Sequence, residues 1–313
     1  MASLRTWIDA CRPKTLVAAA VPVAVGGAVV HVYGRRLDWP VDPSLALAFC
    51  LGFALCVQVA CNFANDLGDT LRGADTSARI GPRRAVANGD ITPAQMKRGI
   101  WVACLLAMVV GSPVGLLSPW LALAGVLAIV CALAYTLGPF PLAYRGLGDV
   151  FVIACFGVQA TALTAWVAWL TAPRCKCGLC GDPMPWTAAL LAGLGLGLLA
   201  DNILVANNAR DYETDVAAGK RTSVVRFGRG FARGLFTLNL VGGLACLGLV
   251  FGWLPLLVAP WALKQAVGFR RAQAAGDFVP FLAQAAALLL VAGALCVTAS
   301  CLGWVPAGFW VSR

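Results

Sequence analysis

Charge is scarce in this chain, and its scarcity excludes most kinds of protein. Lys, Arg, Asp and Glu together make up 12% of the 313 residues, whereas soluble domains typically carry about 25%. Only one histidine is present, and hydrophobic residues account for 60% of the chain. A soluble globular enzyme, a disordered chain and a basic nucleic-acid-binding domain are therefore excluded, and no nucleic-acid partner is expected. The composition predicts a polytopic membrane protein.

The apolar residues fall into nine continuous runs, which predict membrane-spanning helices. A helix needs about 20 apolar residues to cross the hydrocarbon core, and only helices or closed barrels satisfy their backbone hydrogen bonds there. The strands of a barrel would alternate apolar and polar residues, and these runs do not. We expect an all-α protein whose nine transmembrane helices cover residues 15–33, 43–67, 97–117, 119–137, 147–170, 186–208, 231–249, 251–269 and 281–303.

The distribution of positive charge predicts the orientation of these helices. Placing the N-terminus on the cytoplasmic side puts 19 of the 24 Lys and Arg residues on that side and five on the other. This bias follows the positive-inside rule, and anionic lipid would attract the excess charge. The loops 68–96 and 209–230 are then both cytoplasmic, and the C-terminus lies outside. The expected location is a bacterial inner membrane, with membrane lipid as a partner.

Half of the 14 acidic residues are concentrated in two short windows. The windows hold Asp66, Asp69 and Asp75, then Asp201, Asp211, Glu213 and Asp215. Each window lies where an even-numbered helix is expected to meet the cytoplasm. Acids at the membrane edge are costly to hold, so they usually face a polar cavity and have a partner. The two windows therefore predict a functional site.

The two windows also repeat each other at a single offset of 146 residues. The matched pairs are Asn62 with Asn208, Asn65 with Asp211, and Asp69 with Asp215. The second and sixth helices run in the same direction, so the repeat would be parallel, with its pseudo-axis along the membrane normal. We expect a single domain, residues 1–313, built from two parallel four-helix halves at about 10–140 and 145–270, with a last helix at about 281–303.

Helical spacing makes these acids candidate metal ligands. Asn65 and Asp69 lie four residues apart on one helix face, as do Asp211 and Asp215. Oxygen ligands without His or Cys select hard cations, chiefly Mg²⁺, which prefers one or two carboxylates plus substrate phosphate oxygens. The implied ligand is a magnesium diphosphate. In the alternative, the acids pair with neighbouring loop arginines as a solvated face.

Basic and polar side chains near the windows complete this prediction. Some bases should neutralise the diphosphate as it leaves; in the alternative, they touch lipid head groups. The candidate diphosphate contacts are Arg79, Lys97, Lys220, Arg12 and Lys14. Gln58 and Gln159 are polar inside predicted helices, where they either line the cavity or form hydrogen bonds between helices.

Long stretches of the chain resemble a known family, the UbiA superfamily of intramembrane prenyltransferases. Both aspartate windows resemble its two aspartate-rich motifs, and the similarity runs from about residue 10 to the last helix. The stretches that carry it are RPKTL at 12–16, NFANDLGDTLRGADT at 62–76, RIGPRR at 79–84, GDITPAQMKRG at 89–99, AYTLGPFPLAYRGLGDVFV at 134–152 and NNARDYETDVAAGKRTSVVRFG at 207–228.

The resemblance implies a fold and an activity. It implies nine helices around a central cavity that opens to the membrane, with Mg²⁺ between the two motifs. The branch it resembles most joins the isoprenyl chain of a polyprenyl diphosphate to 1,4-dihydroxy-2-naphthoate with loss of the carboxylate, forming demethylmenaquinone in menaquinone biosynthesis. The commoner superfamily pattern has another acid four residues after Asp69, where this chain has Gly73, so the role of Asp75 is open.

The resemblance also assigns roles to residues. The candidate catalytic residues are Asp66, Asp69, Asp211 and Asp215. The candidate metal ligands are Asn65, Asp69, Asp211 and Asp215. The candidate cavity residues are Asn62, Asn208, Tyr135, Tyr144 and Asp149. For the two tyrosines, an interfacial aromatic belt is the alternative.

Two other functions remain open at this point. One is a prenyltransferase for another aromatic acceptor, such as 4-hydroxybenzoate, homogentisate or a tetrapyrrole, because no spacing in the chain names the acceptor. The other is a cation transporter that uses the acidic cavity. A transporter would favour acids nearer the middle of the membrane and would not need basic loops after each window.

Overall fold

The computed structural model describes residues 2–36, 42–74, 80–81, 83–172 and 184–306. Within these ranges every regular element is helical, as the sequence predicts. The α-helices are α1 (Leu4–Ala10), α2 (Val17–Arg36), α3 (Ser44–Leu71), α4 (Pro93–Gly115), α5 (Pro119–Ala134), α6 (Gly148–Phe151), α7 (Ala160–Thr171), α8 (Trp186–Arg210), α9 (Tyr212–Ala217), α10 (Ser223–Phe251), α11 (Ala259–Arg271) and α12 (Ala275–Leu302). Short 3-10 helices are η1 (Pro13–Thr15), η2 (Leu142–Arg145) and η4 (Leu254–Val258), and η3 (Val152–Gln159) is a π-helix.

Seven helical stretches in the described part of the chain are long and apolar enough to cross a membrane. The fourth predicted run forms α5, which has only 16 residues and at 1.5 Å per residue falls short of a core about 30 Å thick. The eighth run is divided between η4 and the 13-residue α11, which carries Lys264, Arg270 and Arg271. The predicted count of nine membrane crossings is therefore not confirmed, although each predicted run does contain helix.

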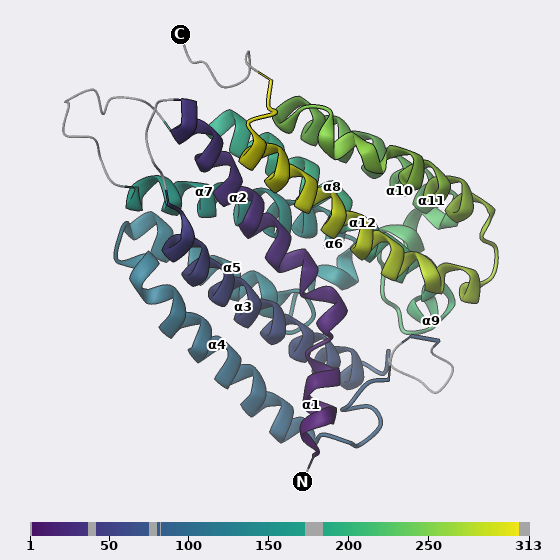
Figure 1. Cartoon of the computed structure of the whole chain (residues 1–313). Coiled ribbons are helices and arrows are strands. Elements are labelled where there is room, and N and C mark those ends of the chain that lie inside the picture. The colour runs from purple at the N-terminus through teal and green to yellow at the C-terminus, as the bar shows by residue number, and fades with distance from the viewer. Residues whose placement is uncertain (1, 37–41, 75–79, 82, 173–183, 307–313) are drawn as a thin grey trace.

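Two apolar clusters hold the bundle together. The larger one joins α2, α7, α8, α10, α11 and α12. The smaller one joins α1, α3 and α4 with the loop at 85–91. Figure 1 shows α2 and α12 running side by side across the bundle, with α3, α4 and α5 on one side and α10 and α11 on the other. The helix α2 therefore packs against the second half of the chain as well as the first.

A close helix contact lies between η3 and α8 and depends on glycine. A Cβ atom added at Gly157 would lie 2.3 Å from the Cα of Gly197 and 2.4 Å from the carbonyl oxygen of Gly193. Small residues let helix backbones approach in this way inside a membrane. The helix that carries η3 runs without a break through α6 and α7, from Gly148 to Thr171, so this contact fixes its position against α8.

We expect Gly157→Ala to destabilise the protein, because overpacking a close contact typically costs about 1–3 kcal/mol. The matched control is Gly234→Ala on α10, where an added Cβ would meet nothing within 4 Å and helix propensity favours alanine. Thermal unfolding in detergent measures both variants. A melting temperature for Gly157→Ala at or above that of the unsubstituted protein would contradict the packing described here.

Candidate functional site

The two acidic windows meet through one lysine. The Nζ atom of Lys220 lies 3.8 Å from Oδ1 of Asp69 and 3.7 Å from Oδ1 of Asp215. Asp69 lies near the C-terminal end of α3, and Asp215 lies on α9 just after the end of α8. Both aspartates are buried. Residues 146 positions apart in the sequence therefore face the same cation.

Local backbone structure places Lys220 between the two carboxylates. Gly219 adopts a positive φ of 68°, a conformation that glycine reaches without steric cost, and this turns the chain after α9. The N–H of Lys220 then donates to the carbonyl of Asp215 at 2.9 Å, and the N–H of Arg221 donates to the carbonyl of Tyr144 at 3.2 Å. The lysine is thus held against η2.

Asp69 is the most heavily engaged carboxylate of the site. Arg84 Nη2 donates to its Oδ2 at 3.0 Å, and the Tyr144 hydroxyl donates to its Oδ1 at 3.0 Å. Burial of the phenol and the negative charge of Asp69 raise the pKa of Tyr144 above its usual value, so this hydroxyl keeps its proton and acts as a donor. Two cations and a phenol therefore converge on one aspartate.

Asp66 holds a loop and does not face the cation. Its Oδ2 accepts the N–H of Ala85 at 2.9 Å and its Oδ1 accepts the N–H of Val86 at 3.2 Å. These bonds fix the loop at 83–91, and the same loop presents Arg84 to Asp69. Asp66 therefore positions a charged partner of the site through the backbone.

The remaining residue of the first motif, Asn65, faces the connection that follows α5. The Thr136 hydroxyl donates to Asn65 Oδ1 at 2.9 Å. Arg72 braces the same connection by donating to the carbonyl oxygens of Thr136 and Gly138 at 2.6 and 2.8 Å. Its guanidinium also lies 5.2 Å from the centre of the Tyr144 ring. Cations therefore approach Tyr144 from two sides, because Lys220 lies 5.4 Å from the same ring.

In the second motif, arginines engage the outer acids. Arg210 binds both carboxylate oxygens of Asp211, at 2.7 and 2.6 Å. Arg229 pairs with Glu213 at 2.7 Å and donates to the carbonyl of Ala209. The first motif lies at the C-terminal end of α3, where the partial charge of the helix dipole is negative, and Asp211 lies at the junction of α8 and α9. Arginine side chains therefore offset the acids of the second motif.

The other predicted diphosphate contacts differ in exposure and in their relation to the acidic site. Arg12, in the connection between α1 and η1, has a positive φ of 51°, which no other non-glycine residue of the described ranges shares, and its charge acts on Asp66. Such a backbone is uncommon outside glycine and concentrates at functional sites. Lys14 and Lys97 are exposed. Arg79, like Asp75, lies outside the described residues.

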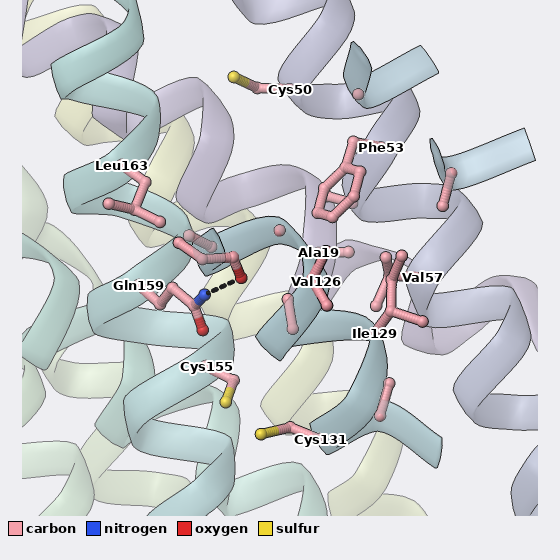
Figure 2. A pocket seen from close by; sticks show the side chains of 18 of the residues that line it. Ala19, Cys50, Phe53, Val57, Val126, Ile129, Cys131, Cys155, Gln159 and Leu163 are labelled. Carbon is pink, nitrogen blue, oxygen red and sulfur yellow. Dashed lines mark hydrogen bonds between the residues drawn. The ribbon is translucent and has the colours of Figure 1, made fainter. Parts of the chain in front are cut away.

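A cavity of about 290 Å³ lies between α2, α3, α4, α5 and the α6–η3–α7 helix, and Cys61, one helical turn before Asn65, is among its lining residues. Its wall is apolar apart from a few side chains, and Tyr135, Gln58 and Gln159 are among its lining residues. Figure 2 shows Phe53 and Val57 on one side of this chamber and Gln159 and Leu163 on the other. We refer to it below as the chamber.

Of the five predicted cavity residues, only Tyr135 lines the chamber. Tyr144 lies at the acidic site, and Asn208 is buried. Asn62 is buried and donates to the carbonyl of Cys11 at 2.8 Å. Asp149 is buried and does not line the chamber, and its carboxyl interacts electrostatically with that of the buried Asp201.

The donor set fits a magnesium ion that also takes ligands from its substrate. No group of three acids, histidines or cysteines converges on one point among the residues the structure describes. The carboxylates of Asp69 and Asp215 do lie close to one point, because both are near the Lys220 ammonium group. Mg²⁺ needs only one or two carboxylates when phosphate oxygens and water supply the rest. All the nearby donors are oxygen atoms, which a hard cation prefers.

Sequence reasoning missed two residues of the site. Arg84 is buried and pairs with Asp69, although it stands in a basic stretch that could equally face lipid. Thr136 is buried and donates to Asn65. Arg84 could have been found from its place in RIGPRR, because that stretch belongs to the quoted resemblance. Thr136 carries no such signal beyond lying in a quoted stretch.

Comparison with known proteins identifies relatives over most of the chain. The model described as the UbiA prenyltransferase family matches residues 19–277. The chain is 35% identical over 277 residues to the 1,4-dihydroxy-2-naphthoate octaprenyltransferase of Escherichia coli, covering 84% of each protein. It is 32% identical over 297 residues to the protein of the same name from Mycobacterium tuberculosis, covering 93% of this chain and 95% of that one.

Solved structures of similar fold come from archaea. A UbiA homolog from Archaeoglobus fulgidus bound to DMAPP and Mg²⁺ matches with a TM-score of 0.54 and 16% identity, over 94% of this chain and 99% of that one. A UbiA homolog from Aeropyrum pernix matches with a TM-score of 0.64 and 15% identity, over 90% and 97%. At these identities the likeness concerns the fold alone.

We expect Asp66→Asn to loosen the loop at 83–91, because one of its two backbone N–H groups would then face an amide NH₂ in place of an oxygen. Leaving a buried donor unsatisfied costs about 1–3 kcal/mol, so the loop should open at least several times more often. Limited trypsin digestion measures cleavage after Arg83 and Arg84. The control is Asp90→Asn, which removes only the surface pair with Arg83. Equal cleavage rates in the two variants would contradict the role given to Asp66.

Proposed function

Because the chain belongs to the UbiA prenyltransferase family, we propose that it transfers a polyprenyl group from its diphosphate to 1,4-dihydroxy-2-naphthoate. The carbon–oxygen bond of the prenyl diphosphate breaks and a carbon–carbon bond to the ring forms. The ring loses its carboxylate as CO₂, which leaves demethylmenaquinone in its reduced form. The naphthoate acceptor is supported by the names of relatives that are 32–35% identical over most of the chain.

The observation that carries the chemistry is the meeting of both motifs at Lys220. We propose Asn65, Asp69, Asp211 and Asp215 as the residues that hold Mg²⁺ at this place. Bound there, the metal supplies Lewis-acid neutralisation of the diphosphate. Asp66 acts on this site through the loop that it fixes.

The charged side chains of the chain bind the diphosphate and stabilise it as it leaves. Lys220 and Arg84 are the best placed, because each already touches Asp69. Arg12 lies beside Asp66 and is the third contact. The exposed Lys14 and Lys97 have the position expected for lipid head-group contacts. Tyr144 donates to Asp69 and orients it.

The chamber protects the reactive prenyl group from water. An allylic cation formed at the acidic site needs a dry environment, or water would add to it. Apolar side chains such as Phe53, Val57 and Leu163 form the chamber wall, which can therefore hold the prenyl chain away from water. The long chain leaves through an opening toward lipid, because water would not solvate it.

We also propose one domain of two parallel halves, residues 10–140 and 145–270, followed by the last helix. The 146-residue repeat and the shared lysine support this division. The positive-inside bias supports a bacterial inner membrane with the acidic site facing the cytoplasm. Asp69 and Asp215 fall in the loops 68–96 and 209–230, which this bias assigns to the cytoplasmic side.

We expect Asp69→Ala and Asp211→Ala to lower turnover by at least a hundredfold while the proteins still insert into membranes. Each change removes an oxygen ligand that stabilises charge in the transition state. Membranes supplied with a prenyl diphosphate, Mg²⁺ and the naphthoate should release diphosphate, and the control Asp90→Ala should behave as the unsubstituted protein does. Near-normal turnover in either variant would overturn the metal assignment.

A panel of aromatic acceptors tests the substrate. Diphosphate release should require 1,4-dihydroxy-2-naphthoate and should stay at background with 4-hydroxybenzoate, homogentisate or no acceptor. Release with another acceptor in preference to the naphthoate would replace the proposed substrate. Absence of release with every acceptor would overturn the proposed activity.

Trypsin added to sealed vesicles tests the orientation. Arg83 has a side chain that is 71% exposed, so the loop that carries it should be cut readily from its own side of the membrane. Inverted vesicles, which expose the cytoplasmic face, should show this cut and right-side-out vesicles should not. The reverse pattern would place the acidic site on the outer face.

A further inference from the structure

Two glutamines interrupt the apolar wall of the chamber, and their hydrogen bonds fix which way each amide points. Gln159 Nε2 donates to the backbone carbonyl of Ala124 on α5 at 3.0 Å, drawn as a dashed line in Figure 2. A backbone carbonyl only accepts, so Gln159 must present its NH₂ group to it. The Oε1 atom of Gln159 is then the end of the amide that does not face Ala124.

A longer chain of hydrogen bonds fixes Gln58. Asn62 Nδ2 donates to the backbone carbonyl of Cys11 at 2.8 Å, so Asn62 Oδ1 is an acceptor. Gln58 Nε2 donates to that Oδ1 at 3.3 Å and to the Thr15 hydroxyl at 3.4 Å. Gln58 is 6% exposed, and its Oε1 has no hydrogen-bond partner within the described ranges. Flipping this amide would set two NH₂ groups or two carbonyls against each other.

The wall of the chamber therefore holds two amides whose NH₂ groups are already engaged, and the oxygen of Gln58 is buried without a partner among the described residues. Leaving such a group unpaired in an apolar environment costs about 1–3 kcal/mol. A prenyl chain has no donor and cannot satisfy either oxygen. A dihydroxylated aromatic ring has two hydroxyl donors, one on each side of the ring. The wall of the chamber is thus complementary to the acceptor as well as to the prenyl group.

We propose that Gln58 and Gln159 bind the hydroxyl groups of the aromatic acceptor and select for a dihydroxylated ring. Gln58 precedes Asn65 on α3 by seven residues, which is about 10 Å along a helix. That separation leaves room for the allylic carbon next to the acidic site and the ring beyond it. Gln58 and Gln159 both line the chamber, so a ring bound in the chamber can meet both amides. This inference rests on the proposed function.

The test compares Gln58→Leu and Gln159→Leu with a matched control. Gln265 on α11 also donates its NH₂ group to a backbone carbonyl, that of Gln284, and leaves Oε1 without a partner among the described residues, but it does not line the chamber. In Gln159→Leu and Gln58→Leu, KM for the naphthoate should rise about tenfold, as expected for one lost hydrogen bond. KM for the prenyl diphosphate should stay unchanged, and Gln265→Leu should change neither.

The inhibition constants of two acceptor analogues distinguish a binding role of the glutamines from a purely structural one. The analogues 1-hydroxy-2-naphthoate and 4-hydroxy-2-naphthoate each lack one ring hydroxyl, and their inhibition constants against the full substrate require no turnover. Each glutamine variant should weaken binding of one analogue about tenfold and leave binding of the other unchanged. The unaffected analogue is the one that lacks the hydroxyl bound by that glutamine, because the hydrogen bond is already lost.

The possible outcomes separate this inference from the proposed function. If the unsubstituted protein releases no diphosphate with the naphthoate, the proposed function fails. If it does so, and Gln159→Leu weakens both analogues and the full substrate equally or raises KM for the prenyl diphosphate instead, the inference is wrong. Gln58→Leu also loses its bonds to Thr15 and Asn62, so if that variant fails to insert, Gln159→Leu decides alone.

Discussion

The attraction between Lys220 and two aspartates from opposite halves of the chain holds the acidic site together. Asp69 and Asp215 are both buried, so their charges repel another negative group that approaches the site. A shared cation offsets that repulsion before substrate arrives. The surrounding loops follow from this need: Asp66 fixes the segment that delivers Arg84, and Gly219 turns the chain so that Lys220 can reach both acids.

Much of this architecture could be predicted from the residues alone. Continuous apolar runs predicted an all-helical membrane protein. The family resemblance implied that the two acidic windows lie on either side of one site, and Lys220 lies near one aspartate of each window. The family that the motifs resembled is confirmed by the match over residues 19–277. The count of nine crossings was less secure, because Pro255 and Pro260 divide the eighth run into η4 and α11.

The rest depended on contacts that spacing does not encode. Arg84 and Arg83 are neighbours in sequence, yet one is buried against Asp69 and the other lies on the surface. Only the backbone of the loop that Asp66 holds decides between them. Likewise, the sequence offered two alternatives for the glutamines, lining the cavity or bonding between helices. Gln159 does both, because it lines the chamber and donates a hydrogen bond to Ala124 on α5. The NH₂ group and the oxygen of one amide can bind different partners, and the sequence alone does not show this.

The glycine contact behind η3 limits how this protein can adapt. Because Gly157 touches Gly193 and Gly197 with no space for a Cβ, the wall of the chamber formed by Cys155, Phe156 and Gln159 cannot retreat toward α8. The side of the chamber formed by α4 and α5 is not limited in this way, because these helices carry exposed apolar side chains such as Leu105 and Leu127 on faces that do not line the chamber. If a bulkier prenyl chain were selected for, the substitutions that make room for it should occur on α4 and α5. The η3 side of the chamber should keep its residues and its position.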